Sequence, residues 1–401
     1  MSSTPRIVIT GVGLHTGHGD TEATWTALRE NHSALTCIHP WNLLPGEQDQ
    51  AQAPSATAGL SFPAAPAPDP SPAEFLVDRK AIKYMGPCTQ MAVLAAGRAL
   101  RDAGLLEAEA APLREAMALF VATGPIAFDV EQALASFDGE DATELLAMRK
   151  PVLHRCHPLL PFKMLLNMPL GLVSIVFGIK GPNFILYPSA EQGGCALAHA
   201  LRGLRRGRFT TALVGGSACC LGLAPIMNLR RAGRLASSLE EAQAFGERHR
   251  GWAPADQAAF VVLETEAEAA RRGRSPYARL DRVEVLGAGA LRYPLPGSAE
   301  GEGQGEAHVL YCTGTLSPPD LAAHCARWAR PVTLASADGM LGVAPAASFL
   351  LGTALLCLAL RHGCVPASLT DGGRDCLVER AMISFQGAEG VATASLCGGT
   401  S

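Results

Sequence analysis

Residues 181–216, GPNFILYPSAEQGGCALAHALRGLRRGRFTTALVGG, decide the fold class of this chain. Gly181-Pro182-Asn183 predicts a tight turn, and the apolar run from Phe184 to Tyr187 predicts a strand directly after it. Residues 193–207 have the length and apolar spacing of a helix, and residues 211–216 predict another buried strand. A strand, a helix and a second strand in this order indicate an α/β fold.

The chain before this stretch shows the same alternation. Residues 7–10 are mostly β-branched and run into Gly11-Val12-Gly13, which is typical of a buried strand that ends in a turn. Residues 91–106 have helical spacing, and residues 119–122 predict the next strand. Residues 40–72 are instead rich in Pro, Ala, Ser and Gln and have no apolar period, so they predict an irregular excursion over the surface.

The chain after this stretch begins a second series of strands. Residues 278–286 alternate between apolar and charged side chains, which predicts a strand with one exposed face. Residues 308–311 and 331–335 predict two further strands, and residues 381–385 and 390–396 predict a strand pair near the end.

One uncharged segment, residues 339–360, is long enough to span a bilayer. Its first part is rich in Gly and Ala and contains Pro345, and no belt of interfacial aromatic residues flanks it. We therefore expect a buried helix and no membrane insertion.

The composition narrows the class of protein. The chain has 401 residues, of which 48% are hydrophobic and 17% charged, and this excludes a disordered chain. A formal net charge of -4 provides no basic field, so nucleic acid is not expected as the main ligand. The twelve cysteines include no C-x-x-C pair, and the N-terminus has no leader pattern, so we expect a reducing, cytoplasmic location. His154, Cys156 and His157 lack a fourth ligand, and no metal site is expected.

Five separated segments, taken in order, resemble one protein family. They are Arg6–Gly13, Lys83–Met85 with Gln90–Ala92, Met168–Asn183, Gly251–Glu264 and Leu358–Gly363. Together they are similar to the β-ketoacyl synthases of the thiolase fold, and the likeness covers nearly the whole chain. The resemblance implies five layers, α-β-α-β-α, built from two duplicated halves, here residues 1–265 with the excursion 40–72, and residues 266–401.

The same resemblance implies a chemistry and its partners. The family forms tight dimers and joins acyl and malonyl groups by decarboxylative Claisen condensation. An acyl carrier protein supplies these groups on its phosphopantetheine, so no cofactor bound to this chain is expected. The reaction needs a cysteine nucleophile at a helix N-terminus, two histidines and a lysine.

Counting along the family's motifs places other residues at these four positions. Ala190 takes the place of the cysteine, and Tyr311, in Tyr311-Cys312-Thr313-Gly314-Thr315, takes that of the first histidine. Asp338 replaces the lysine and Val343 replaces the second histidine. An alanine cannot attack a thioester, and a phenol with a pKa of about 10 is a poor substitute for imidazole. These substitutions predict a chain that has no catalysis of its own.

A catalytically silent member of this family resembles the chain-length factors, which pair with an active ketosynthase in type II polyketide, aryl-polyene or related systems. Glu191-Gln192 is similar to a Glu-Gln signature of those chains, one residue displaced. Such a subunit limits product length by placing bulky residues at the end of its partner's acyl tunnel. The candidate tunnel or interface residues are Phe128, Ala133, Leu134, Phe162 and Leu165.

Each of these assignments has a plainer alternative. The five candidate tunnel residues are at least equally typical of ordinary core or interface packing. Arg230, Arg231 and Arg234 are candidate contacts for an acidic carrier protein, or simply a solvated face. The whole chain is alternatively a malonyl-carrier decarboxylase that primes synthesis, a homodimeric scaffold, or a lone acyl-binding module.

Overall fold

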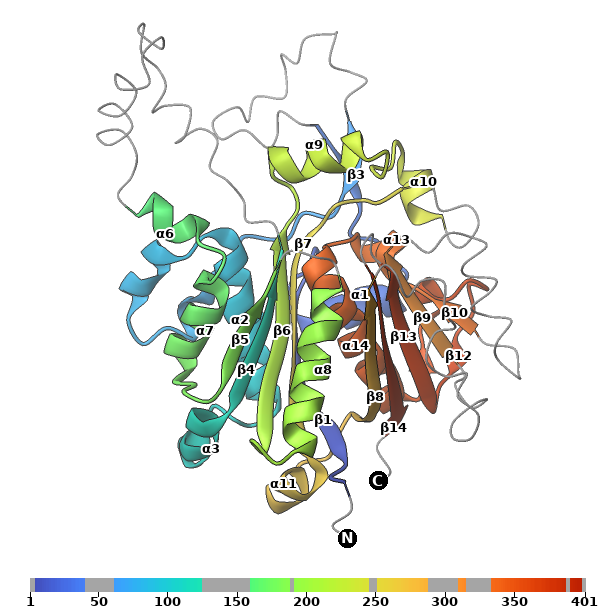
Figure 1. Ribbon diagram of the computed structural model, residues 1–401. Helices are drawn as coiled ribbons and strands as arrows, with labels where there is room; N and C mark the ends of the chain where they lie inside the picture. Colours follow the sequence, from blue (N-terminus) through green and yellow to red (C-terminus); the bar gives the residue numbers. More distant parts are fainter. Residues whose placement is uncertain are drawn as a thin grey trace, which may run out of the picture.

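The computed structural model describes residues 4–39, 61–124, 159–187, 191–244, 251–287, 309–314, 333–386 and 390–398. Ten strands of this part form one sheet in the order β10-β9-β13-β14-β8-β1-β7-β6-β4-β5 (Figure 1). The strands of the first half are β1 (Ile7–His15), β4 (Ala118–Thr123), β5 (Asn183–Leu186), β6 (Thr211–Cys219) and β7 (Asp256–Thr265). Those of the second half are β8 (Ala278–Gly287), β9 (Val309–Gly314), β10 (Thr333–Ala335), β13 (Arg380–Gln386) and β14 (Gly390–Gly398).

The two halves of the sheet repeat one topology. If the five strands of each half are numbered along the chain, their order in the sheet, starting from the outer edge, is 3-2-4-5-1. This order is β5-β4-β6-β7-β1 in the first half and β10-β9-β13-β14-β8 in the second. The fifth strand, β7 or β14, is antiparallel to both of its neighbours, while the second, third and fourth strands are parallel. This repeat confirms the predicted duplication. A boundary between residues 265 and 266 stays a prediction.

A short seam joins the halves. β1 and β8 pair only through Val8 with Arg279 and Ile9 with Ala278. The partners inside each half form much longer ladders, such as β1 with β7 from Ile7 to His15. Most of the contact between the halves therefore comes from the helices packed between them.

Two long helices fill the space between the half-sheets. They are α8 (Gln192–Arg205) and α14 (Pro345–His362), and one buried apolar cluster joins them to strands of both halves (Figure 1). Glycines let these layers approach closely: a Cβ atom at Gly216 of β6 would collide with the Ala346 carbonyl of α14. The left-handed Gly363, at φ 70°, ends α14.

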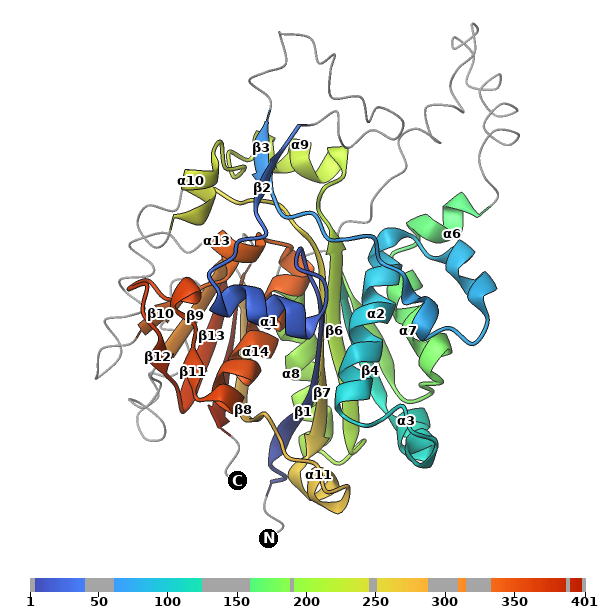
Figure 2. The same ribbon diagram turned by 180° about the vertical axis from the view of Figure 1, so that it is seen from behind.

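A second helical layer covers the other face of the first half. Here α2 (Pro87–Asp102) and α7 (Met168–Phe177) pack on the sheet in a separate apolar cluster (Figure 2). Pro87 at the first position of α2 suits a helix start, where no backbone donor is needed. Within the described residues, helix, sheet, helix and sheet thus account for four of the five predicted layers.

Shorter elements complete the described part. Helix α1 (Thr21–Arg29) begins at Asp20, whose side chain accepts a hydrogen bond from the Ala23 N–H. The remaining elements are β2 (Thr36–Ile38), β3 (Phe62–Ala64), η4 (Pro72–Glu74), η5 (Arg79–Tyr84), η6 (Ala108–Ala110), α3 (Ala111–Ala116), α6 (Leu160–Met164), α9 (Leu223–Arg231), α10 (Leu239–Gln243), α11 (Glu266–Arg271), α13 (Asp338–Leu341), β11 (Cys364–Val365), η9 (Ala367–Leu369) and β12 (Cys376–Leu377).

Two predictions need correction. The excursion predicted for residues 40–72 ends earlier, because Phe62–Ala64 form the buried strand β3 and pack against Leu221 and Ile226. The uncharged run 339–360 is two helices, α13 and α14, separated at Gly342 with φ 71°. Helix α14 is apolar and long enough to cross a membrane, yet 83% of it is buried inside the molecule. The prediction of a buried helix is therefore confirmed for α14.

Candidate functional site

Three of the four positions that the family resemblance assigns to catalysis, Tyr311, Asp338 and Val343, lie where β9, α13 and the start of α14 meet. Tyr311, in β9, is only 1% exposed. Its hydroxyl oxygen accepts a hydrogen bond from the Ala337 N–H at 3.1 Å. Its ring lies against Gly352 of α14, where a Cβ atom would come within 2.5 Å of the Tyr311 Cε1. Burial, followed by the nearby Asp338 carboxylate, raises the pKa of Tyr311 well above its usual value, so the phenol stays neutral.

Asp338 begins α13 and fastens it to the end of β9. One carboxylate oxygen accepts from the Thr313 hydroxyl at 2.7 Å, and the other accepts from the Gly314 N–H at 2.9 Å. A lysine at this position would have donors only and could not accept from the Gly314 N–H. The side chain that replaces the family's lysine therefore forms a structural link between two elements.

Val343 lies in the extended segment between α13 and α14. Its N–H donates to the Ala253 carbonyl at 2.8 Å, and its carbonyl accepts from the Ala255 N–H at 3.1 Å. Its side chain is buried in this packed link and has no polar atom. The position predicted for the second histidine thus serves packing between the halves.

The N-terminus of α8 carries the remaining predicted residues. Ala190 lies outside the described residues, while the buried Glu191 caps the helix and Gln192 is its first residue. The Cys195 N–H donates to the Glu191 carbonyl, so this thiol lies one turn into the helix. Burial and the Glu191 carboxylate raise the pKa of Cys195, which keeps it a thiol and a weak nucleophile.

Two of the five candidate tunnel residues can be placed. Phe162, in α6, is 46% exposed, and Leu165, just after it, is 47% exposed. The Phe162 ring meets Tyr84 edge to face with centroids 6.2 Å apart. Ordinary core packing is therefore the wrong interpretation for these two residues, while Phe128, Ala133 and Leu134 lie outside the described residues.

The three candidate carrier contacts have unlike surroundings. Arg230 and Arg231 end α9 and are exposed. The Arg234 guanidinium is partly buried over the Trp252 ring, 5.7 Å from its centroid. Arg234 is therefore partly committed to packing, which sequence reasoning did not anticipate.

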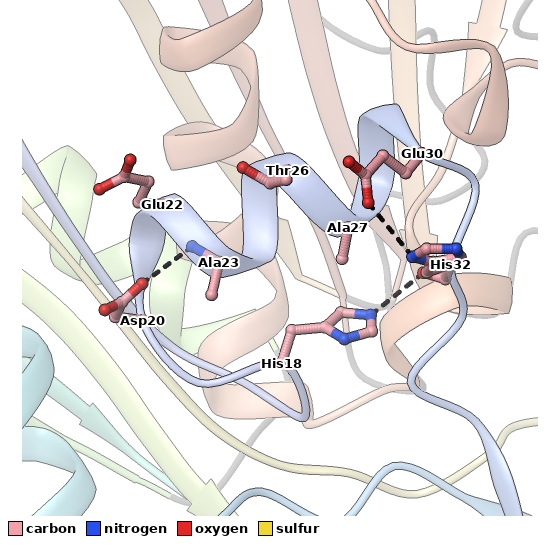
Figure 3. Close-up of a pocket in the computed structure, with 8 residues that line it drawn as sticks. All are labelled: His18, Asp20, Glu22, Ala23, Thr26, Ala27, Glu30 and His32. Atoms are coloured by element: carbon pink, nitrogen blue, oxygen red, sulfur yellow. Dashed lines mark hydrogen bonds and ion pairs between the residues drawn. The ribbon is translucent and has the colours of Figure 1, made fainter.

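A pocket of about 540 Å³ lies beside α1, away from these residues (Figure 3). Its polar lining includes three carboxylates and two histidines, and four of these five groups have partners of their own. Asp20 caps α1, the His18 Nε2 is 3.1 Å from the His32 carbonyl, and the His32 Nδ1 is 3.4 Å from Glu30 (Figure 3). Burial lowers the pKa of His18, which favours its neutral form. In the described part of the chain no group of His, Cys, Asp or Glu side chains could hold a metal ion.

Sequence reasoning missed two polar residues in β7, one partly buried and one fully buried. Asp256 accepts a hydrogen bond from the Leu221 N–H at 3.1 Å, and burial raises the pKa of its carboxyl to about 6. Gln257 is fully buried, and neither of its amide atoms has a hydrogen-bond partner. The segment GWAPADQAAFVVLE carried only a family likeness, so no local signal distinguished these side chains.

Comparison with known proteins agrees with this architecture. The model for the family described as "Beta-ketoacyl synthase, N-terminal domain" matches residues 4–269. Nodulation protein E of Rhizobium leguminosarum bv. trifolii is 28% identical over 285 residues, which cover 70% of this chain and 63% of that protein. The chain thus spans less than two thirds of the length of the first curated relatives that it matches.

Solved structures give the same fold over the full length. The ishigamide ketosynthase/chain length factor has a TM-score of 0.74 at 18% identity and covers 98% of this chain and 99% of its own. A type II PKS acyl-carrier protein in complex with its ketosynthase also has a TM-score of 0.74, at 16% identity, with 98% and 100% covered. The matched family model, the duplicated five-stranded units and the helices between them show that this chain belongs to the β-ketoacyl synthase family and has the thiolase fold.

Proposed function

We propose that this chain is the non-catalytic chain-length factor of a two-subunit, cytoplasmic ketosynthase. Its active partner would carry out decarboxylative condensation on chains held by an acyl carrier protein, in polyketide, polyene or fatty-acid-like biosynthesis. The observation that carries the proposal is the state of Tyr311 and Asp338, whose polar atoms bind the backbone of the chain itself.

The chemistry of condensation explains why this observation matters. The reaction needs a thiolate to hold the acyl group and neutral donors to polarise the malonyl thioester. Tyr311 is neutral, but its hydroxyl is buried inside the chain and accepts from the Ala337 N–H, and the Asp338 carboxylate is taken by β9. With alanine at the nucleophile position by count, the condensation is assigned to a partner.

The outer surface near β5 supports a partner subunit. Among the described residues β5 pairs only with β4, so in that part of the chain its other edge is open, with Phe184 55% and Tyr187 49% exposed. Most exposed large apolar side chains of the described residues lie on this side, on η5, α6, α7, β5 and the links between them (Figure 1). They are Tyr84, Phe162, Met164, Leu165, Leu166, Ile175, Phe184 and Tyr187. An apolar surface around an open strand edge is typical of a subunit interface.

Phe162 and Leu165 give the interface its proposed role in chain length. Both project from the apolar side rather than into the core, so a subunit packed there would meet them. In the proposal they close the far end of the partner's acyl tunnel, together with Phe128, Ala133 and Leu134. The carrier protein brings phosphopantetheine, and exposed Arg230 and Arg231, with Arg234, form its proposed contact.

Native mass spectrometry of the chain purified from its own host tests this function. We expect a one-to-one complex with a ketosynthase that is acylated on its own active-site cysteine. A homodimer without a ketosynthase would favour the scaffolding alternative. Carbon dioxide release from malonyl carrier protein by the isolated chain would favour the decarboxylase, and acyl uptake without any partner would favour a lone binding module.

A further inference from the structure

A basic stripe runs along α8 beside the open edge of the sheet. His199, Arg202 and Arg206 are three and four residues apart, so they share one side of the helix, and all three are exposed. The His199 ring stacks on Phe120 of β4 at 6.4 Å and lies 5.9 Å from Phe184 of β5. These contacts fix the stripe next to β5 on the face of the sheet that α8 covers.

The two arginines of the stripe have no balancing charge. Neither Arg202 nor Arg206 forms an ion pair with a described carboxylate, whereas Lys180, at the start of the same edge, binds Glu115 at 2.8 Å. Arg205, between them in sequence, donates to the carbonyl oxygen of Asp281 rather than to its carboxylate. The apolar segment 164–179, which includes α7 on the opposite face of the same half-sheet, contains no charged residue at all. The border of the proposed interface therefore carries uncompensated positive charge.

The geometry of strand pairing determines which residues of a second subunit would face Arg202 and Arg206. Two copies that pair antiparallel along β5 are related by a two-fold axis perpendicular to the sheet. A rotation about such an axis leaves the α8 side of both sheets facing the same way. The α8 helices of the two copies would therefore lie side by side across the axis and run in opposite directions. Arg202 and Arg206 would then face the same arginines of the second copy.

We propose that the stripe His199-Arg202-Arg206 excludes a second copy of this chain and selects a partner subunit of the same fold that presents carboxylates on its facing helix. The inference rests on the proposed function, because it takes the β5 edge as the place of pairing. Like charges held close together at an interface oppose association, while complementary charges strengthen it and speed encounter. The stripe thereby specifies a heterodimer.

Charge complementation between copies of this chain tests the stripe directly. A double variant, Arg202→Glu with Arg206→Glu, carries a mass tag and is mixed in equal amounts with the wild-type chain. We expect the mixed dimer to form at least about tenfold more tightly than either homodimer at low salt. The gain should shrink at about 0.5 M salt, where screening acts over a few ångströms. Sedimentation velocity and native mass spectrometry measure both quantities.

The matched control reverses two exposed arginines elsewhere. Arg230→Glu with Arg231→Glu makes the same change of charge on α9, and mixing it with the wild type should give no mixed dimer above the homodimer level. Circular dichroism and melting temperature establish that each variant is folded. No preferential mixed dimer with the α8 variant, including no association in any combination, would overturn the stripe proposal.

A second measurement separates the stripe from the function itself. The wild type and the α8 variant are each expressed in the host, and the co-purifying ketosynthase is quantified. Loss of the ketosynthase from the α8 variant alone supports selection by the stripe. Equal recovery with both chains overturns the stripe but leaves the chain-length-factor proposal intact, whereas no ketosynthase with the wild type counts against that proposal.

Discussion

The two edges of the ten-stranded sheet are the same strand of the repeat, yet the chain treats them differently. At β10 the Leu334 carbonyl accepts from the Asp371 N–H, Ala335 bridges to Thr370, and the Ser336 N–H donates to Leu369, so the chain covers its own edge. At β5 the edge stays open and carries exposed aromatic rings. A duplicated fold can thus close one half and reserve the other for association.

Two of the positions that the family resemblance assigns to catalysis belong to the closed edge. Tyr311 pairs with Ala335 across β9 and β10, and its hydroxyl binds Ala337 just beyond β10. Asp338 then ties α13 to the end of β9. At β5, by contrast, the described residues leave an exposed apolar edge. The two halves of the repeat therefore differ in how the outer strand is finished: one is tied to its own chain, and the other carries an exposed apolar surface.

Removing the Tyr311 ring should break the closed edge and have the largest effect. Tyr311→Ala leaves a cavity between β9 and α14, so we expect the free energy of unfolding to fall by about 4 kcal/mol. Tyr311→Phe keeps the ring and loses only the hydrogen bond to Ala337, which should cost about 1 kcal/mol. Urea denaturation measures both, and equal losses in the two variants would contradict a packing role for the ring.

Charging the open edge should break association while the fold survives. Phe184→Asp with Tyr187→Asp places carboxylates on exposed positions of the apolar side. We expect the affinity for the partner to fall at least about a hundredfold, with a change in unfolding free energy below about 0.5 kcal/mol. Met227→Asp, on the exposed part of α9, is the control, and it should pair normally in the same pull-down. Undiminished pairing of the double variant would place the interface elsewhere.

The half with the open edge also contains a partly buried acid, Asp256, that should make stability depend on pH. The Asp256 carboxyl binds a proton more tightly in the folded chain, with a pKa of about 6, than in the unfolded chain, where it is 3.8. Its contribution to stability is therefore full below pH 3.8 and is lost as the pH rises through 6. Two pKa units correspond to roughly 3 kcal/mol.

Asp256→Asn removes this titration and keeps an oxygen for the Leu221 N–H. The variant should gain stability relative to the wild type as the pH rises from 4 to 7, by up to about 3 kcal/mol. His15, whose pKa burial lowers, titrates in both chains and cancels in the difference. Denaturation curves at a series of pH values measure the effect, and a difference that does not vary with pH would refute the assignment.

The last variant should have the smallest effect on stability. It tests whether the open edge controls the length of the acyl product. Phe162→Ala shortens an exposed side chain, so unfolding should change by less than about 0.5 kcal/mol. In the reconstituted complex we expect longer products, because the truncated residue would no longer stop the growing chain. Mass spectrometry of the products decides, with Leu377→Ala as an exposed control away from the interface. Unchanged length with Phe162→Ala would remove this residue from the tunnel proposal.

Local pattern predicted most of the sheet because strands and helices of this fold are strongly apolar over short distances. The predicted helix at 193–207 and strand at 211–216 match α8 and β6 closely. No pattern marked β7 as a strand, and composition alone could not reveal the break at Gly342, where a positive φ separates α13 from α14. The spacing of apolar residues predicts which face of an element is buried, but it does not predict the backbone angle of a single residue.

The site was predictable only as a set of positions. Counting along motifs located Tyr311 and Asp338, but their hydrogen bonds to Ala337 and Gly314 depend on neighbouring elements that are distant in sequence. The exposure of Phe184 was equally out of reach, because an apolar edge strand and an apolar central strand have the same sequence pattern. Whether a strand has a neighbour on both sides is decided only when the whole sheet is assembled.

The contact between Tyr311 and Gly352 also constrains the order in which this chain can change over evolutionary time. Any larger residue at 352 would collide with the ring while Tyr311 is present, since even a Cβ atom there lies 2.5 Å from the ring and from Ile383. Replacing the tyrosine by a smaller residue first would leave a void beside the glycine. Positions 311 and 352 therefore constrain each other, and a change at either one alone lowers the stability of the fold.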